Sequence, residues 1–121
     1  MNFCPKQHNV VFLALPGVNM IDLGGPIQAF SSCNELGLGG TTYELITASE
    51  NGGLLRSSSG LEVQTRALSD LDPERIDSVI VPGGARPGAP PESRAISSWL
   101  AKHHGSFSRV CSVRTPPVLR S

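Results

Sequence analysis

The chain has 121 residues, of which 39% are apolar and 17% charged, a balance typical of one globular domain rather than of a disordered segment. Its ten basic and ten acidic residues cancel and form no basic stripe, which argues against nucleic-acid contact by this stretch. The longest apolar run, residues 10–15, is too short to cross a bilayer, so we expect no membrane partner.

The first half of the chain predicts two strands around one helix. Residues 9–15, NVVFLAL, are continuously apolar, as in a strand buried on both faces of a parallel sheet. Pro26 suits a first helical turn, and the spacing that follows predicts a helix over residues 26–36 that ends at Gly37. Residues 43–48 predict the second strand. The helix stripe expected to face the sheet consists of Ile27, Phe30, Cys33 and Leu36.

The second half predicts a ribbon, two more strands and a clear helix. The expected elements are a turn at 51–53, a β-ribbon of 54–57 and 61–64 around 58–60, a brief helical turn at 67–72, a buried strand at 76–81, a Pro/Gly-rich loop at 85–91, a helix at 92–104 and a last buried strand at 109–113. Ile96, Trp99, Leu100 and His103 give the helix its apolar stripe, and Gly105 is expected to cap it.

Strands that alternate with helices predict an α/β fold with a parallel sheet covered on both sides. In such sheets ligands bind at the carboxyl ends of the strands. Three loops occupy those ends, at residues 16–26, 82–90 and 114–117, and we expect them to converge in space.

Three residues in the first two loops are candidates for binding. Two interpretations of Asp22 stay open: a helix-start carboxylate stabilised by the helix dipole, or a carboxylate aimed at a reacting group on the last strand's turn. Gly83 and Gly84 follow Pro82 at a strand end, where glycine lets backbone N–H groups approach an anion. The same three residues also make an ordinary turn, so the motif is weak by itself.

The turn after the last strand carries Arg114, an always protonated side chain that cannot act as a nucleophile. Cys111 is the only thiol near this turn, and we expect it to be buried in a packed face of the strand. His103 and His104 end a helix, where imidazolium stabilises the helix dipole; a catalytic base among them is the open alternative.

Cysteine usage and the amino terminus bear on the compartment. Cys4, Cys33 and Cys111 are widely spaced and form no C-x-x-C pair, which favours a reducing cytoplasm over a disulfide framework or a zinc site. Residues 1–8 lack the plan of a secretory signal, which agrees with a cytoplasmic protein. No phosphate-binding loop and no metal-ligand cluster is present in the sequence, so we expect no cofactor.

Four segments together resemble the ThiJ/PfpI superfamily, also called class I glutamine amidotransferase-like domains. They are P-G-V-x-x-x-D-L-x-G-P at 16–26, R-S-S-S-G-L at 56–61, D-S-V-I-V-P-G-G at 77–84 and R-V-x-S-V at 109–113. The resemblance covers about residues 10–113 and is nearest to the amino-terminal domain of AraC-type transcriptional regulators; isonitrile hydratases share much of it. It implies a flavodoxin-like or Rossmann-like sandwich, usually dimeric, that a helix-turn-helix pair follows in the regulators.

The resemblance also implies site residues. Asp22 matches the carboxylate of the D-L-x-G-P motif, and Gly83 and Gly84 match the glycines of the loop that lines the pocket. The family's last strand reads S-V-C-T-G, but here Arg114 replaces the cysteine and Pro116 replaces the glycine. The matching positions of that strand are Ser112, Val113 and Thr115. We therefore expect no cysteine-dependent hydrolase or hydratase chemistry, and an Asp22–Arg114 ion pair in the former pocket is a hypothesis.

Agreement with the family stops after Val113. This predicts a domain at residues 9–113 between an amino-terminal tail, 1–8, and a divergent tail, 114–121, with a sandwich left incomplete at its carboxy-terminal side by a shifted frame or a truncated gene. Two functions stay open. The favoured one is a non-catalytic sensor domain, or its remnant, of an AraC-type regulator without its DNA-binding domain, which binds a small molecule through Asp22, Gly83, Gly84 and Arg114. The other is an isonitrile-hydratase-like or amidase-like enzyme inactivated at Arg114.

Overall fold

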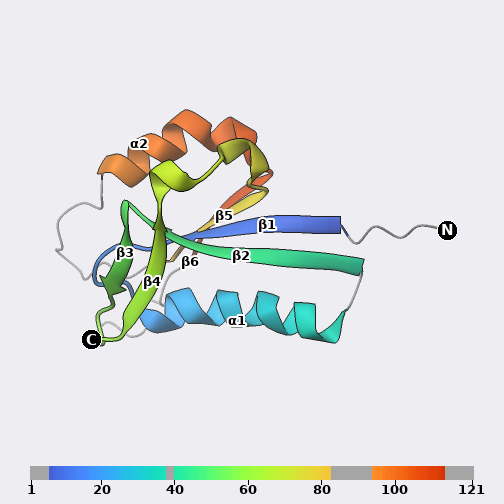
Figure 1. Cartoon of the computed structure of the whole chain (residues 1–121), viewed down its shortest axis with the longest axis horizontal. Helices are drawn as coiled ribbons and strands as arrows, with labels where there is room; N and C mark the ends of the chain where they lie inside the picture. Colours follow the sequence, from blue (N-terminus) through green and yellow to red (C-terminus); the bar gives the residue numbers. More distant parts are fainter. Residues whose placement is uncertain (1–5, 38–39, 83–93, 114–121) are drawn as a thin grey trace.

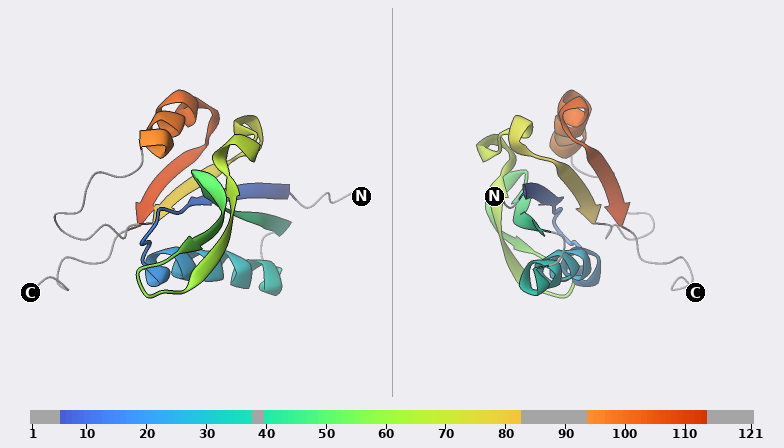
Figure 2. Two further views of the ribbon diagram at one scale, coloured as in Figure 1. Left: turned by 60° about the vertical axis from the view of Figure 1, so that its left-hand side comes forward. Right: turned by 90° about the vertical axis from the view of Figure 1, so that its right-hand side faces the viewer.

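The computed structural model describes residues 6–37, 40–82 and 94–113, which form an α/β sandwich (Figure 1). The strands are β1 (Lys6–Leu13), β2 (Thr41–Ser49), β3 (Asn51–Arg56), β4 (Glu62–Ala67), β5 (Ser78–Pro82) and β6 (Arg109–Val113). The described sheet has the order β3-β4-β2-β1-β5-β6, in which only β3 runs antiparallel to its neighbour. Helix α1 (Met20–Leu36) covers one face and helix α2 (Arg94–His103) the other (Figures 1 and 2). The predicted parallel sheet covered on both sides is confirmed.

The central strand is β1, because its sequence is apolar on both faces. It pairs in parallel with β2 along its whole length and with β5 at residues 10–12. Its four consecutive residues Val10, Val11, Phe12 and Leu13 are all 0% exposed. The predicted buried strand is confirmed, although it starts at Lys6 and ends at Leu13.

Alternate residues of β1 build two separate cores, since successive side chains point to opposite faces. Val10 and Phe12 belong to the core under α1, together with Leu23. Val11 and Leu13 belong to the core under α2, together with residues of that helix. Neither described helix is long and apolar enough to cross a membrane.

Helix α1 follows its predicted stripe for two turns and then departs from it. Ile27 and Phe30 pack on the core, but Cys33 and Leu36 are exposed, so that part of the prediction is wrong. The inward position of the last turns belongs to Asn34. Its side chain donates to the Tyr43 carbonyl and accepts from the Tyr43 N–H, both at 2.8 Å. We call this pair of hydrogen bonds the amide clamp. It joins the end of α1 to the start of β2, whereas β4 pairs with β2 only at residues 48–49.

The predicted end of α1 is confirmed, since Gly37 caps it in the left-handed conformation with φ 64°. Helix α2 ends differently. It passes after His103 into a 3₁₀ turn, His104–Ser106, so the predicted cap at Gly105 is wrong. The tighter turn returns Phe107, 8% exposed, to stack on Trp99 with ring centroids 5.3 Å apart.

The predicted stripe of α2 is confirmed at Ile96, Trp99 and Leu100. The ring of His103 lies beside that of Trp99, with centroids 5.6 Å apart. The predicted start of the helix at Glu92 lies outside the described residues.

The predicted β-ribbon is confirmed as the antiparallel pair β3–β4, but residues 51–53 are part of β3 rather than a turn. Gly52 and Gly53 have φ of 72° and 78°, values that glycine adopts readily. A Cβ on Gly52 would lie 2.8 Å from the Ala67 nitrogen. The chain reverses just before them, between Ser49 and Asn51, and these glycines permit close pairing with β4. The predicted helical turn at 67–72 is present as a 3₁₀ turn, Leu68–Asp70.

Strand β6 has the predicted bounds, but the prediction that it is buried is wrong. Val110 is 47% exposed and Cys111 is also exposed. Cys111 shares a sheet face with its β5 partner Ile80, the face that α1 covers. Because α1 packs against β2, the far end of this face remains open over β6 in the described part of the chain.

The strands β1, β5 and β6 are tied together at their amino ends by Asp77. Its Oδ2 accepts from the Asn9 N–H at 2.7 Å, and its own N–H donates to the Asn9 carbonyl at 2.9 Å. Its carbonyl accepts from the N–H groups of Ser108 and Arg109 at 2.7 and 3.3 Å. The Ile76 N–H donates to the Pro73 carbonyl at 3.3 Å, which closes a turn, so β5 begins at Ser78 rather than at residue 76.

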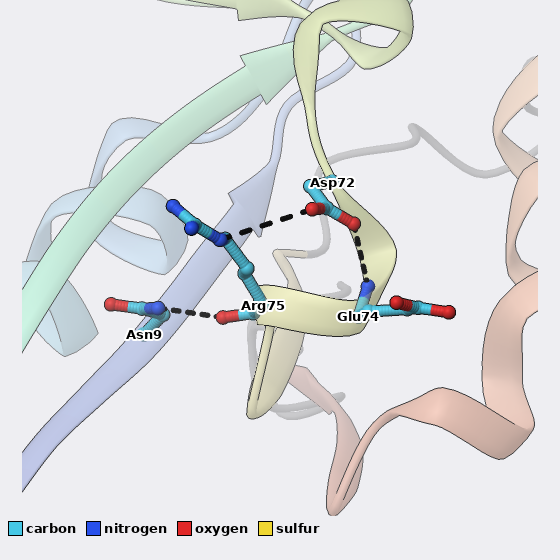
Figure 3. A network of polar contacts seen from close by, with 4 residues as sticks. All are labelled: Asn9, Asp72, Glu74 and Arg75. Carbon is cyan, nitrogen blue, oxygen red and sulfur yellow. Dashed lines mark hydrogen bonds and ion pairs between the residues drawn. The ribbon is translucent and has the colours of Figure 1, made fainter.

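A 3₁₀ turn before β5, Pro73–Arg75, supports this junction (Figure 3). The Asn9 side chain donates to the Arg75 carbonyl at 2.6 Å. Asp72 caps the turn by accepting from the Glu74 N–H at 3.1 Å, and its carboxylate lies 3.9 Å from Arg75 Nε. The turn is thus fixed on the amino end of β1.

The amide clamp predicts a stability effect. Asn34→Ala removes both hydrogen bonds to the Tyr43 backbone, and we expect the free energy of unfolding to fall by about 1–3 kcal/mol in urea titrations. Gln28→Ala is the matched control, since Gln28 is exposed on the same helix and its side chain donates to Ser32. Equal losses in the two variants would show that the clamp contributes nothing specific.

Candidate functional site

The carboxyl ends of β1, β5 and β6 lie at one edge of the sheet. Phe12 is paired with Ile80, and Pro82 is paired with Val113. Because the strands are parallel neighbours, β5 and β6 end side by side at Pro82 and Val113. This is the edge at which open α/β sheets bind ligands.

Four of the predicted site residues follow these strand ends directly. Gly83, Gly84, Arg114 and Thr115 lie outside the described residues, and so does any contact between Asp22 and Arg114. The convergence of the three loops therefore stays a prediction, supported by the shared edge from which two of them start.

Helix α1 begins at the same edge, beside the strand ends (Figures 1 and 2). Asp22 is in its first turn. The helix begins at Met20 and not at Pro26, because Asn19 caps it. Asn19 Oδ1 accepts from the N–H groups of Ile21 and Asp22 at 2.9 and 3.2 Å. Pro26 is accommodated inside the helix, where it lacks an N–H for the backbone ladder. The predicted helix start was therefore wrong by six residues.

The position of Asp22 agrees with the interpretation of a helix-start carboxylate. It is in the first turn and only 5% exposed. The partial positive charge of the helix N-terminus favours a carboxylate at this position. The second interpretation, a carboxylate directed at residue 114, stays a prediction.

The loop before α1 is held by the turn of the β-ribbon. The Gly17 N–H donates to the Arg56 carbonyl at 2.9 Å, and the Ser58 N–H donates to the Val18 carbonyl at 3.0 Å. Val18, 2% exposed, anchors the loop in the core. Gly17 has φ 82°, which suits glycine at this turn. The ribbon turn thus positions the segment that carries Asp22.

Sequence reasoning missed both of these supports. Asn19 could have been found, since an asparagine before an apolar run with an acid in its first turn is a helix-start signal. The contact between Gly17 and Arg56 had no local signal, because it joins residues far apart in the chain. Ser57, 5% exposed and 3.1 Å from the Ser59 hydroxyl, belongs to the same ribbon turn.

The described residues place a carboxylate at this edge, whereas the turn after β6 lies outside them. The Cys111 thiol is on an open face of β6 and not at the strand end. His103 and His104 precede β6, so they lie at the amino edge of the sheet, opposite the candidate site. Within the described residues no three His, Cys, Asp or Glu side chains are grouped as a metal site. Among the described residues, this edge carries the carboxylate of Asp22.

Comparisons with known proteins give a consistent set of relatives. The sequence profile of the DJ-1/PfpI family matches residues 8–119. An uncharacterized protein in the cpoL 5' region of Streptomyces lividans is 34% identical over 107 residues, which are 87% of this chain and 74% of that protein.

Solved structures share the fold. An AraC family transcriptional regulator from Pseudomonas putida superimposes with a TM-score of 0.70 at 18% identity, over 86% of this chain and 55% of that one. A ThiJ/PfpI family protein from Pseudomonas syringae gives 0.70 at 17% identity, over 88% and 42%. A putative transcriptional regulator from Vibrio parahaemolyticus gives 0.67 at 18% identity, over 88% and 56%. The chain therefore spans about half the length of these proteins, and the predicted flavodoxin-like α/β class is confirmed.

The cap at the start of α1 predicts a graded effect on stability. Asn19→Ala leaves the N–H groups of Ile21 and Asp22 without their acceptor, and we expect a loss of about 1 kcal/mol in urea titrations. Asn19→Asp keeps an acceptor oxygen and should retain most of the stability. If the alanine and aspartate variants unfold at the same urea concentration, the cap does not determine where α1 begins.

Proposed function

Because the chain belongs to the DJ-1/PfpI family, we propose that it is the non-catalytic, ligand-sensing domain of an AraC-type transcriptional regulator. The sensor domain ends at Val113 in this proposal, but its first strand begins at Lys6, so residues 6–8 belong to the domain and not to the predicted tail. It acts in the cytoplasm as a homodimer. In this proposal DNA contact belongs to a separate domain of the regulator.

The observation that carries this proposal is the likeness to proteins named as transcriptional regulators. Two of the solved structures with this fold carry that name, from Pseudomonas putida and Vibrio parahaemolyticus. The chain spans 55% and 56% of their lengths, which leaves room in such proteins for a further domain. Fold likeness alone does not fix function, so the proposal also draws on the residues of the site.

Those residues favour binding over catalysis. Arg114 stands where the family's pattern has cysteine, and a guanidinium can neither attack a carbonyl nor take a proton. Asp22 offers carboxylate oxygens at the ligand edge, and Gly83 and Gly84 offer backbone N–H groups. A small amide or ammonium compound that also carries an acceptor oxygen has the chemistry to use both.

A thermal-shift panel of small primary amides, amines and isonitriles tests this binding role. At a concentration of about 100 Kd, a ligand adds about 2.7 kcal/mol of stability, which raises Tm by roughly 10 °C for a domain of this size. We expect at least one amide or amine to do so for the wild type and to lose most of its effect with Asp22→Asn.

Asp70→Asn is the matched control, because Asp70 is an exposed acid in a 3₁₀ turn. Its ligand response should equal that of the wild type. The stabilising compound should also be recovered unchanged after long incubation. Conversion of an amide or isonitrile by the wild type would overturn the non-catalytic proposal in favour of an enzyme.

The regulator proposal makes a separate prediction about the gene. Translation of the genomic DNA downstream of codon 108 in all three frames should give a helix-turn-helix pair within the same transcription unit. The reason is that a sensor acts on transcription only through a DNA-binding domain. A downstream sequence that completes the sandwich and then stops would contradict the proposal.

A further inference from the structure

The amino edge of the sheet, opposite the candidate site, carries polar side chains on the face that α1 covers. Residues two apart in a strand share a face. His8 precedes Val10 by two residues on β1, and Val10 is in the core under α1. Ser78 is the β5 partner of Val10, and Arg109 is the β6 partner of Ser78. His8, Ser78 and Arg109 therefore lie on one face of three neighbouring strands, and we call them the amino-edge cluster.

A hydrogen bond joins two members of the cluster. His8 Nε2 lies 2.9 Å from Ser78 Oγ, and the edge of the Tyr43 ring contacts the imidazole with ring centroids 5.7 Å apart. Ser78 is 9% exposed and His8 is half-buried. When Nε2 carries a hydrogen, it donates to Ser78 Oγ and leaves the hydroxyl hydrogen available to a ligand. His8 is thus a positioning residue for the hydroxyl of Ser78.

Arg109 brings a positive charge next to this hydroxyl. Its N–H donates to the Asp77 carbonyl at 3.3 Å, which fixes where β6 begins. The Arg109 side chain is exposed, and the described part of the chain holds no carboxylate in ion-pair contact with it. The carboxylate of Asp77 accepts instead from the Asn9 N–H at 2.7 Å. A guanidinium beside a hydroxyl donor, without a carboxylate to neutralise it, suits an anionic ligand.

The sheet next to the cluster is apolar. Ile80 follows Ser78 by two residues on β5, and its β6 partner is Cys111. Both lie on the same face as the cluster, about 7 Å further along the strands. Cys111 is exposed, because in the described part of the chain α1 packs against β2 and leaves β6 open. A ligand held at Arg109 therefore has an apolar surface beside its charged group.

We propose that the amino-edge cluster binds organic carboxylates with a short apolar tail. The Arg109 guanidinium and the Ser78 hydroxyl donate to the carboxylate oxygens, because the planar fork of a guanidinium matches a carboxylate. The tail lies over Ile80 and Cys111. This site goes beyond the proposed function and does not rest on it, because Asp22 is at the opposite edge of the sheet.

The Cys111 thiol permits a chemical test in the full chain. Iodoacetate carries a carboxylate on a short alkylating group, and iodoacetamide is its neutral counterpart. In both reactions the thiolate displaces iodide and forms an S–C bond, so the ratio of the two rates cancels the reactivity of the thiol itself. The chain carries Cys4→Ser, and Cys33, exposed on α1, is the internal reference. Peptide mass spectrometry follows the alkylation of each cysteine.

We expect the iodoacetate-to-iodoacetamide rate ratio to be at least roughly tenfold higher at Cys111 than at Cys33, because a bound carboxylate holds the reactive carbon near the thiol. Butyrate should abolish this excess. Arg109→Gln and Ser78→Ala should each remove most of it. Arg66→Gln is the matched control, because Arg66 is an exposed arginine on the opposite face of the sheet, and this variant should keep the excess.

The role of His8 is tested by a double-mutant cycle. His8→Leu should lower the rate ratio at Cys111 as Ser78→Ala does, and the double variant should lower it no further, since His8 acts through the Ser78 hydroxyl. Additive losses would overturn the positioning role and show that His8 contacts the carboxylate itself.

Three outcomes would overturn the carboxylate site. The first is an equal rate ratio at Cys111 and Cys33. The second is an excess that Arg109→Gln removes but Ser78→Ala keeps, because Arg109 then attracts anions by charge alone. The third is equal suppression by inorganic phosphate and by butyrate at matched ionic strength, which would exclude a preference for apolar carboxylates. The competition by butyrate needs no substitution, so it decides the matter even where a variant does not fold.

Discussion

The complete burial of β1 is the constraint on which the rest of the structure depends. Residues 10–13 are apolar on both faces, so a helix must cover each face and a strand must pair with each edge. The reciprocal hydrogen bonds between Asn9 and Asp77 then fix the register of β5 against β1. A slip by one residue would turn Val10 and Phe12 toward α2 and exchange the two cores.

The location of the candidate site follows from this arrangement of strands. The chain leaves β1 at the edge where β5 and β6 also end, and α1 begins there because Asn19 caps it. The ribbon turn contacts the loop between them, so the position of Asp22 depends on residues far away in the sequence. The motifs that resemble the family pattern lie in these same segments.

The sequence predicted the elements whose signals lie within the element itself. It did not predict the features that depend on contacts with segments far away in the chain. The apolar run of β1 and the stripe of α2 needed no outside information, and both are confirmed. Cys33 and Leu36 were predicted to face the sheet, but Asn34 lies on the inner side of α1 because its side chain bonds to the Tyr43 backbone of β2. The exposure of Cys111 depends on how far α1 extends over the sheet. The pattern of apolar residues along β6 carries no information about that extent. For the site, the sequence predicted Asp22 at the ligand edge, whereas the other predicted site residues follow Pro82 and Val113 and lie outside the described residues.

The pairing of β1 with β5 has a consequence for how the chain is synthesised. Val10 is made early, but its partner Ser78 is 68 residues further along, a delay of roughly 3–14 s at the usual rate of translation. During that interval β2 can pair with one edge of β1. The other edge, and the face on which α2 later packs, stay exposed. An apolar strand that is fully buried in the folded chain is therefore exposed through most of synthesis. We expect a chaperone that recognises extended apolar segments to bind residues 10–13 of the nascent chain.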